Sequence, residues 1–322
     1  MPPEQFRQDI TGLSIVRIRE LIDTAEPDAM LVDALSSDPR AGVRALSRNL
    51  ENRRRRAIML RNRQESLLAL EKKLRNDGLK LIAGVDEAGR GPLAGPVVAA
   101  SVILPDDIDI PGIDDSKKLS PQRREELYVL ITARAHAWGI GMTDNEEIDA
   151  FNILDATMKA MRSAVENMGV VPNIVLVDGN RSPGCSCRER LVTDGDSLCR
   201  CIAAASILAK VTRDRIMTEM DRMFPVYGFA RHKGYGAPEH IEAIAKYGPC
   251  ILHRISFRIV PARSPAGTSA AVLKNRLINA PTREVLDRAA AGIAHIRDTL
   301  NHRDIEMLRE VYRACAGRFN GR

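Results

Sequence analysis

The sequence predicts a layered α/β domain, close to the α+β type, in which a mixed sheet is flanked by helices. Two observations on its 322 residues carry this prediction. Short apolar runs typical of strands alternate with longer segments of helical periodicity between about residues 79 and 224. Two of these runs also end abruptly in acidic and glycine residues, as strands do where they leave a sheet.

The first 78 residues predict a basic, helical extension to this domain. Two short amphipathic segments, 13–22 and 30–35, indicate a small helical head. Asp38 as the N-cap and Pro39 as the first helical residue predict a longer helix. We expect that helix to fray or bend at 53–56, where four adjacent arginines repel one another.

Positive charge is concentrated in this extension. The whole chain has a net charge of +6 and a pI near 9.1. Residues 39–80 hold thirteen Lys and Arg against four Asp and Glu, a surplus of nine, whereas residues 1–38 hold three Arg against eight acids. Such a basic segment is typical of contact with nucleic acid, although a solvated helix face has the same composition.

The remaining elements are expected in chain order. Apolar runs predict strands at 79–85, 97–104, 137–143 and 173–177, and helical patterns predict helices that begin at Ser120-Pro121 and that span 146–168 and 202–224, with a hairpin-like insertion through Val192. From about Pro261 the stretch PARSPAGTSAA is typical of a linker, and 282–300 and 304–316 predict two helices. We therefore expect three parts: the extension 1–78, a central domain 79–260, and a linker with a helical appendage, 261–322.

Bulk composition limits the location and the cysteine chemistry. No apolar stretch reaches the roughly 18 residues that span a bilayer, and MPPEQFRQDI does not read as a signal peptide, so we expect a cytoplasmic protein without membrane contact. Six cysteines are then expected as reduced thiols. Two CxC pairs, Cys185 with Cys187 and Cys199 with Cys201, raise the alternative of a zinc site, but structural zinc usually uses CxxC spacing and free thiols are favoured.

Two nucleotide-binding motifs are excluded. The stretch 89–95 is spaced GxGxxxG and leads into a strand, whereas a dinucleotide fingerprint must open a helix. The stretch 84–89 has the outer glycines of a phosphate-binding loop, but Arg90-Gly91 follows where Lys-Ser/Thr is required.

Carboxylates at strand ends are the stronger indication of chemistry. Asp86 and Glu87 follow the first strand, Asp178 follows the fourth, and Asp196 precedes a helix. Because neighbouring strand residues point to opposite faces, Asp86 and Glu87 serve one site only if the strand stops there, which the following glycines permit. Taken alone, Asp178 is equally well explained as a turn residue and Asp196 as a helix N-cap.

Acidic ligands without Cys or His partners suit a hard cation, Mg²⁺ or Mn²⁺. Next to a basic segment, such a cluster favours phosphodiester cleavage assisted by two metal ions, as in nucleases and polymerases.

Several longer motifs follow one another along the central domain. They are AGVDEAGRGPLAGPVVAASVILP (83–105), DDSKKLS (114–120), LVDGN (176–180), GDS (195–197), IAAASILAKVTRDR (202–215), YGFARHKGYGAPEH (227–240) and HRISF (253–257). Together they resemble the bacterial ribonuclease HII family, of the type 2 ribonucleases H. The resemblance covers about residues 79–260 and implies a ribonuclease-H-like fold, a mixed sheet packed by helices.

The resemblance also implies roles for single residues. The metal-binding and catalytic carboxylates would be Asp86, Glu87, Asp178 and Asp196. Gly89, Arg90 and Gly91 would clamp the 2′-OH of the ribonucleotide, and Tyr235 would stack beside the neighbouring sugar. This fits the chemistry, because the 2′-OH distinguishes RNA from DNA and glycine permits close backbone approach. Residues expected near phosphates or the rim of the site are Lys117, Lys118, Arg213, Lys233 and His232.

One position departs from the family pattern. The family commonly has Lys two residues before the fourth carboxylate, where this chain has Asp194. The change could raise metal affinity, alter phosphate binding, or point away from the site.

The implied activity is cleavage of the RNA strand of RNA/DNA hybrids and nicking of duplex DNA 5′ to embedded ribonucleotides by two-metal hydrolysis, giving 3′-OH and 5′-phosphate ends. We expect these nucleic acids as the partners of the protein, and we expect the protein to be a monomer. The extension loosely resembles one that aids substrate binding in some family members, and the tail 261–322 resembles no part of the family core, so its partner stays open. The alternative is a nucleic-acid-binding module without catalysis.

Overall fold

The computed structural model describes residues 12–24, 29–108, 110–257, 283–295 and 302–319, with 273, 274, 277, 278, 280, 297 and 300. The predicted linker stretch 261–271 lies outside these residues. Contacts between Cα atoms divide the chain into two compact units, Met1–Ala69 and Leu70–Arg322. In the described ranges, every helix is too short or too polar to cross a bilayer.

The first unit is helical, as predicted. Helix α2 spans Ile15–Thr24, α3 spans Ala29–Ser36, and α4 spans Ala41–Asn76, so that its last turns belong to the second unit. The apolar faces of the three helices share one buried cluster in which Leu35 and Leu50 are fully enclosed.

Two details of α4 differ from the prediction. Helix α4 begins at Ala41, two residues later than the predicted first residue Pro39, although the Asp38 carboxylate does accept from the Arg40 amide at 2.8 Å and pairs with the Arg40 guanidinium at 2.7 Å. Fraying at 53–56, one of the two expected outcomes, is also wrong, since α4 continues through the four arginines. Glu51 pairs with Arg55 at 2.7 Å, which offsets part of their repulsion.

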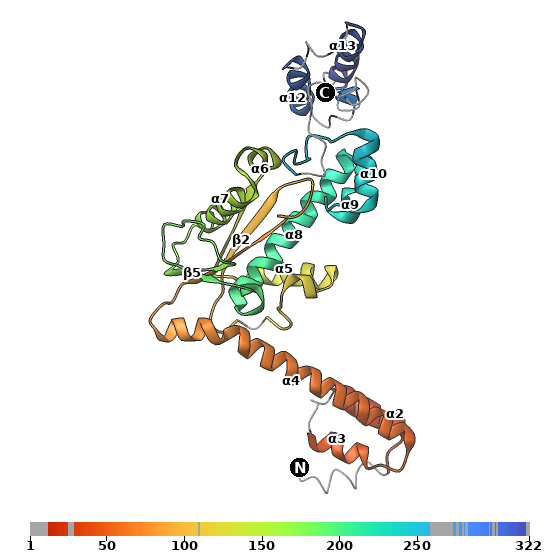
Figure 1. Ribbon diagram of the computed structural model, residues 1–322. Helices are drawn as coiled ribbons and strands as arrows, with labels where there is room; N and C mark the ends of the chain where they lie inside the picture. The colour runs from red at the N-terminus through yellow and green to blue at the C-terminus, as the bar shows by residue number, and fades with distance from the viewer. Residues whose placement is uncertain are drawn as a thin grey trace. The chain divides into compact units, whose positions relative to one another are not determined.

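The second unit is built on a five-stranded mixed sheet with the order β3-β2-β1-β4-β5, which confirms the predicted fold class (Figure 1). Strand β1 pairs antiparallel with β2 and parallel with β4, and is therefore central. The strands are β1 (Ile82–Ala88), β2 (Val97–Ile103), β3 (Ala137–Thr143), β4 (Ile174–Asp178) and β5 (Glu189–Val192).

The segment after β4 does not form the hairpin-like insertion that we predicted. Strand β5 pairs with β4 in the parallel direction, with Val175 opposite Glu189. The connection 179–188 therefore returns to the end of the sheet at which β4 begins, whereas a hairpin would turn back where β4 ends. It makes this return without the helix usual in a parallel crossover.

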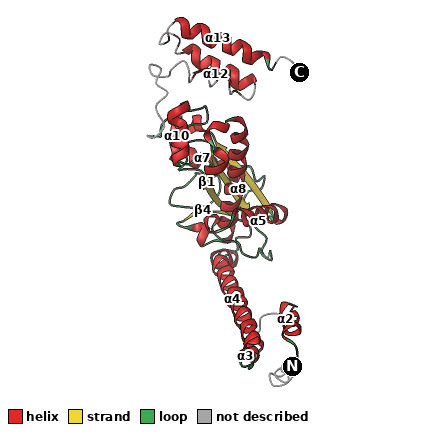
Figure 2. Cartoon of the chain, turned by 90° about the vertical axis from the view of Figure 1, so that its right-hand side faces the viewer, coloured by secondary structure: helices red, strands yellow, loops and turns green. Residues whose placement is uncertain are grey.

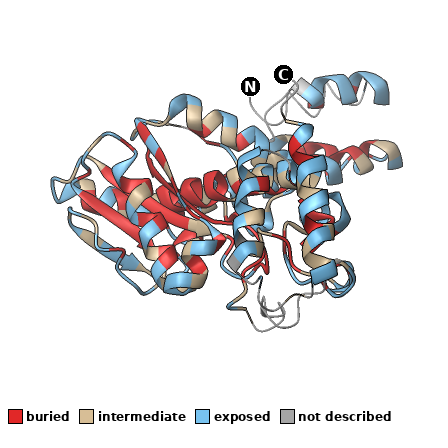
Figure 3. Cartoon of the chain, turned by 90° about the horizontal axis from the view of Figure 1, so that it is seen from above, coloured by how far each residue is buried: buried red, intermediate tan, exposed pale blue. Residues whose placement is uncertain are grey.

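Helices cover both faces of the sheet (Figures 1 and 2). Helix α7 (Ile153–Glu166) packs on one face and α8 (Arg200–Met223) on the other. A Cβ atom at Gly84 would lie 2.3 Å from the backbone of Cys201 in α8, so the missing side chain lets this helix sit directly on β1. Buried residues are concentrated in the sheet and the helices facing it (Figure 3).

The predicted helix 146–168 is two helices, α6 (Asn145–Phe151) and α7. Asn152 separates them with a φ of 93°, which a continuing helix does not allow. Its amide donates to the carbonyl of Ile148 at 2.9 Å, and its side chain accepts from the Leu154 amide at 2.9 Å, so one residue ends α6 and caps α7.

The other predicted helices are found close to their expected positions. Ser120 caps α5 and accepts from the Arg123 amide at 3.2 Å, with Pro121 in the first turn. Two helices of the predicted appendage share an apolar cluster of their own. The remaining elements are α5 (Pro121–Arg134), α9 (Phe229–His232), α10 (Pro238–Tyr247), α12 (Arg283–His295) and α13 (His302–Gly317), with short 3₁₀ turns η1 (Ser116–Lys118), η2 (Gly195–Ser197) and η3 (Pro225–Tyr227).

Candidate active site

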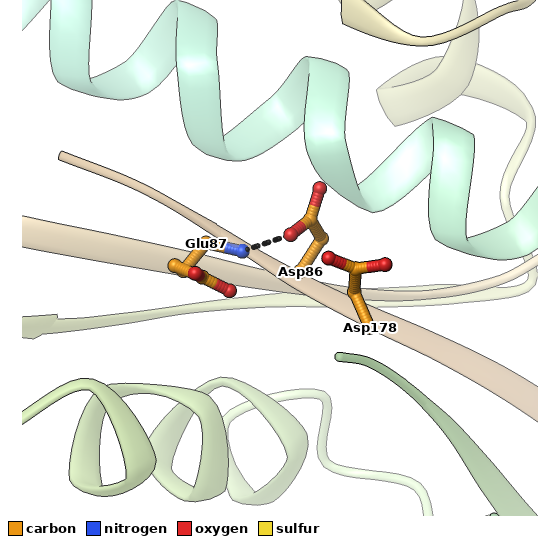
Figure 4. A group of neighbouring side chains, drawn as sticks. All are labelled: Asp86, Glu87 and Asp178. Carbon is orange, nitrogen blue, oxygen red and sulfur yellow. Dashed lines mark hydrogen bonds between the residues drawn. The ribbon is translucent and has the colours of Figure 1, made fainter. Parts of the chain in front are cut away.

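Three carboxylates meet where β1 and β4 end. Val85 lies opposite Val177 in the parallel pair, so the next residues, Asp86 and Asp178, are neighbours on the same face. Asp86, Glu87 and Asp178 each offer one oxygen, and these oxygens lie within 4.8 Å of one another (Figure 4).

We expected Asp86 and Glu87 to share one site only if the strand stops at them, and this condition is wrong. Strand β1 continues to Ala88, with Glu87 opposite Ala99 in β2. Pairing with β4 ends at Val85, however, so this edge of β1 is open beyond that residue and the Glu87 carboxylate joins the other two from the other face.

Burial and mutual repulsion disfavour the charged forms of this group. Burial raises the pKa of Asp86 well above its ordinary range, and the charges of Glu87 and Asp178 raise it further. Burial also raises the pKa of Asp178 to about 6, with contributions from the charges of Asp196 and Glu87. Such a cluster of oxygen ligands with excess negative charge fits a hard divalent cation.

Asp196 lies beside this group and not within it. It is buried at 6% exposure, and its carboxylate pairs with the Lys117 ammonium at 3.3 Å. Its neighbour Gly195 donates its amide to Asp178 Oδ1 at 2.7 Å, which ties η2 to the end of β4. Asp194, at the position that departs from the family pattern, is exposed and has a left-handed φ of 54°.

The glycine loop after β1 and the carboxylates line one cleft of about 240 Å³. Gly89 has a φ of 97°, and a Cβ there would lie 2.1 Å from Nε of Arg213, so only glycine fits. The half-exposed Arg90 pairs with Glu87 at 3.2 Å. Tyr235 is 46% exposed in the same cleft, with a ring carbon 3.6 Å from the Cβ position of Gly91.

Three other residues expected at phosphates have partners within the protein. Arg213 is 1% exposed and donates to the carbonyls of Pro96, Ala94 and Lys233 at 3.0, 3.2 and 3.0 Å, so it supports the loop from below. Lys118 lies 3.6 Å from Asp114, and Lys233 donates to the carbonyl of Ala230 and lines a separate hollow of about 440 Å³.

His232, also expected near the rim, is held by backbone groups. Its Nε2 lies 2.8 Å from the carbonyl oxygen of Tyr227, and its Nδ1 accepts from the Gly234 amide at 3.2 Å.

Sequence reasoning missed four residues that build the site. Arg254 is fully buried and donates to the carbonyls of Gly89, Arg90 and Gly95 at 2.6 to 3.0 Å, which holds the glycine loop. The others line the cleft: Ser206, whose hydroxyl favours a lower pKa of Asp86, Ser116, whose Oγ is 2.8 Å from that of Ser206, and Lys210. All four lie within the motifs quoted above, and those motifs were the signal from which these residues could have been found.

The cysteine pairs lie on opposite faces of the sheet. Cys199 and Cys201 are buried on the α8 face, whereas Cys185 and Cys187 pack against the cluster on the α7 face. All four are free thiols, and burial raises the pKa of Cys185 and of Cys199 to about 12. They are therefore poor nucleophiles at neutral pH.

Comparison with known proteins identifies the family. The family described as Ribonuclease HII matches residues 83–260, and its N-terminal domain matches residues 14–75. Ribonuclease HII of Acetivibrio thermocellus is 55% identical over 196 residues, covering 61% of this chain and 77% of that protein. The enzyme of Ruminiclostridium cellulolyticum is 44% identical over 254 residues, covering 79% of this chain and 95% of that protein.

Solved structures show a more distant likeness. The ribonuclease H2 of Pyrococcus horikoshii OT3 is 24% identical, with a TM-score of 0.48, over 65% of this chain and 98% of that one. The family matches together span most of the described residues from Ser14 to Phe257. This chain belongs to the ribonuclease HII family of endonucleases.

Proposed function

We propose that this chain cuts the RNA strand of RNA/DNA hybrids and nicks duplex DNA on the 5′ side of embedded ribonucleotides, leaving 3′-OH and 5′-phosphate ends. The observation that carries the proposal is the convergence of Asp86, Glu87 and Asp178 with the loop 89–91 in a single cleft. Family membership supports the reaction class, and the cleft supports the choice of a ribose-bearing substrate.

Asp86, Glu87 and Asp178 would hold Mn²⁺ or Mg²⁺, with Asp196 beside them. Bound in pairs, such ions supply an activated water and stabilise the leaving oxygen. The protein contributes a buried, acidic setting in which Lys117 pairs with Asp196 and Arg90 pairs with Glu87. The Glu87 amide donates to Asp86 at 2.7 Å and the Gly195 amide donates to Asp178, so both carboxylates are oriented before any ion binds.

Recognition of the sugar would fall to Gly89, Arg90, Gly91 and Tyr235. Arg254 fixes the loop backbone by donating to its carbonyls, so the amides of the loop would meet a 2′-OH without rearranging. Tyr235 presents an exposed ring next to Gly91, at the place where a neighbouring sugar would pack. Lys117 is suited to the rim, while Lys118 and Lys233 are suited to phosphates farther along the duplex.

The test is a nicking assay on a duplex that contains one ribonucleotide, with Mn²⁺ and Mg²⁺ in turn. Wild-type protein should nick 5′ to the ribonucleotide, and Asp86→Asn should abolish nicking while hybrid binding persists. The same duplex with a 2′-deoxy nucleotide at that position should resist cutting. Equal cutting of both duplexes would make this a general nuclease, and hybrid binding by a wild-type chain that never cuts would favour a binding module.

A further inference from the structure

A buried carboxylate on α4 caps the helix that follows the site. Glu71 is 1% exposed and lies in the part of α4 that belongs to the second unit. Its Oε1 accepts from the amide of Cys201 at 2.8 Å, and its Oε2 lies 3.4 Å from the guanidinium of Arg200. Arg200 and Cys201 begin α8, whose own N-cap residue Cys199 supplies no side-chain bond. Glu71 therefore provides the cap from a different helix.

One hydrogen-bonded path leads from this cap to the carboxylates. The amide of Cys199, just before α8, donates to the carbonyl of Gly195 at 2.8 Å. The amide of Gly195 donates in turn to Asp178 Oδ1 at 2.7 Å. A shift at the start of α8 would thus be passed through η2 to a carboxylate of the ion group.

A second path leads from the same contact to Lys117. Arg200, which is 4% exposed, donates to the carbonyl oxygens of Ile108 at 2.9 Å and Pro105 at 3.1 Å. These residues stand in the segment between β2 and η1, and η1 carries the Lys117 that pairs with Asp196. Through Arg200, Glu71 therefore also holds the segment that leads to Lys117, the partner of Asp196.

We propose that Glu71 is a positioning residue for the ion site: it fixes the start of α8 and the segment before η1, and thereby sets the placement of Asp178 and Asp196. The effect on ion binding rests only on the proposed metal site, and the role in cleavage rests also on the proposed reaction. Residue 71 lies within the match to the family's N-terminal domain, 14–75, and before the match to the main domain, which begins at residue 83.

The direct test is Mn²⁺ binding to the full-length chain without substrate, measured by the electron paramagnetic resonance signal of free Mn²⁺. Glu71→Gln removes the charge opposite Arg200 and is expected to weaken Mn²⁺ binding by up to about tenfold, because loss of a direct partner of a metal ligand costs about 10- to 100-fold and Glu71 acts through further bonds. Glu65→Gln is the matched control, because Glu65 is exposed on the same helix and pairs only with Arg61 among the described residues, at 3.3 Å. Unchanged Mn²⁺ affinity in folded Glu71→Gln would overturn the proposal.

Cleavage kinetics separate positioning from substrate binding. With Glu71→Gln, kcat should fall at limiting Mn²⁺ and recover at saturating Mn²⁺, while KM for the hybrid stays unchanged. A raised KM with normal Mn²⁺ dependence would overturn the proposal.

A second variant keeps the test decisive if Glu71→Gln does not fold. Arg200→Lys keeps a cation opposite Glu71 but loses the fork that reaches Ile108 and Pro105, and it should weaken Mn²⁺ binding in the same direction. A folded Arg200→Lys with wild-type Mn²⁺ affinity would overturn the proposal. Failure of wild-type protein to cut, with normal Mn²⁺ binding, would instead refute the proposed function alone.

Discussion

Replacing Arg254 by Lys should loosen the glycine loop and destabilise the fold. Arg254 is fully buried, and its three guanidinium nitrogens donate to the carbonyls of Gly89, Arg90 and Gly95. A lysine carries the same charge on one nitrogen, so one or two carbonyls lose their donor. Because each buried acceptor left without a donor costs about 1–3 kcal/mol, we expect the free energy of unfolding to fall by about 2–4 kcal/mol.

Thermal and urea unfolding of the full chain measure this loss. A change of 1 kcal/mol moves the midpoint by about 2–4 °C in a domain of 150–250 residues, so Tm should fall by roughly 4–16 °C. Arg222→Lys is the matched control, since its side chain is 74% exposed and pairs with Glu219 on the surface, and it should change the unfolding free energy by less than about 0.5 kcal/mol. An unchanged Tm together with an unchanged cleavage rate in Arg254→Lys would refute the view that its guanidinium holds the loop.

Three further variants test the site and the packing around it. In metal-free buffer, Asp178→Asn should match wild type near pH 4 and be more stable than wild type at pH 7. Folding raises the pKa of Asp178 to about 6, so the stability that protonated Asp178 contributes below its ordinary pKa is lost as the pH rises through about 6. Urea titrations with and without Mn²⁺ check this: the ion should reverse the order at pH 7, and equal stability at both pH values would contradict it. Gly84→Ala should lower the unfolding free energy by about 1–3 kcal/mol, because its methyl group meets the α8 backbone, whereas Gly12→Ala has open space. Asn152→Ala should cost about 1–2 kcal/mol through the lost cap, and Asn152→Gly clearly less, as calorimetry would show.

Local signals in the sequence predicted much of the fold. The Ser120-Pro121 pair marked the start of α5, and the apolar run 137–143 matched the bounds of β3. Long-range pairing was harder to predict. The direction of β5 depends on which end of β4 the connection reaches before β5 begins, and four residues without strong alternation carry no such information. Asn152 was missed because a helical pattern continues on both sides of it.

The residues of the candidate site also divide into those that local sequence predicted and those that depend on long-range contacts. Asp86, Glu87 and Asp178 were found because they stand at strand ends, and the parallel register of β1 and β4 explains why they meet. The roles of Arg254 and Glu71 could not be predicted, because their bonds join segments more than a hundred residues apart or go to backbone carbonyls that any sequence offers. Such contacts leave no pattern of their own in a single sequence.

The central strand takes its two neighbours from very different distances along the chain. Strand β2 begins 9 residues after β1 ends (97 minus 88), whereas β4 begins 86 residues after it (174 minus 88). Because short loops close at lower entropic cost, β1, β2 and β3 can pair during synthesis before β4 has been made. At that stage Asp86 and Glu87 have no Asp178 beside them. A growing chain therefore lacks one of the three carboxylates of the candidate site until β4 has been made and has paired with β1.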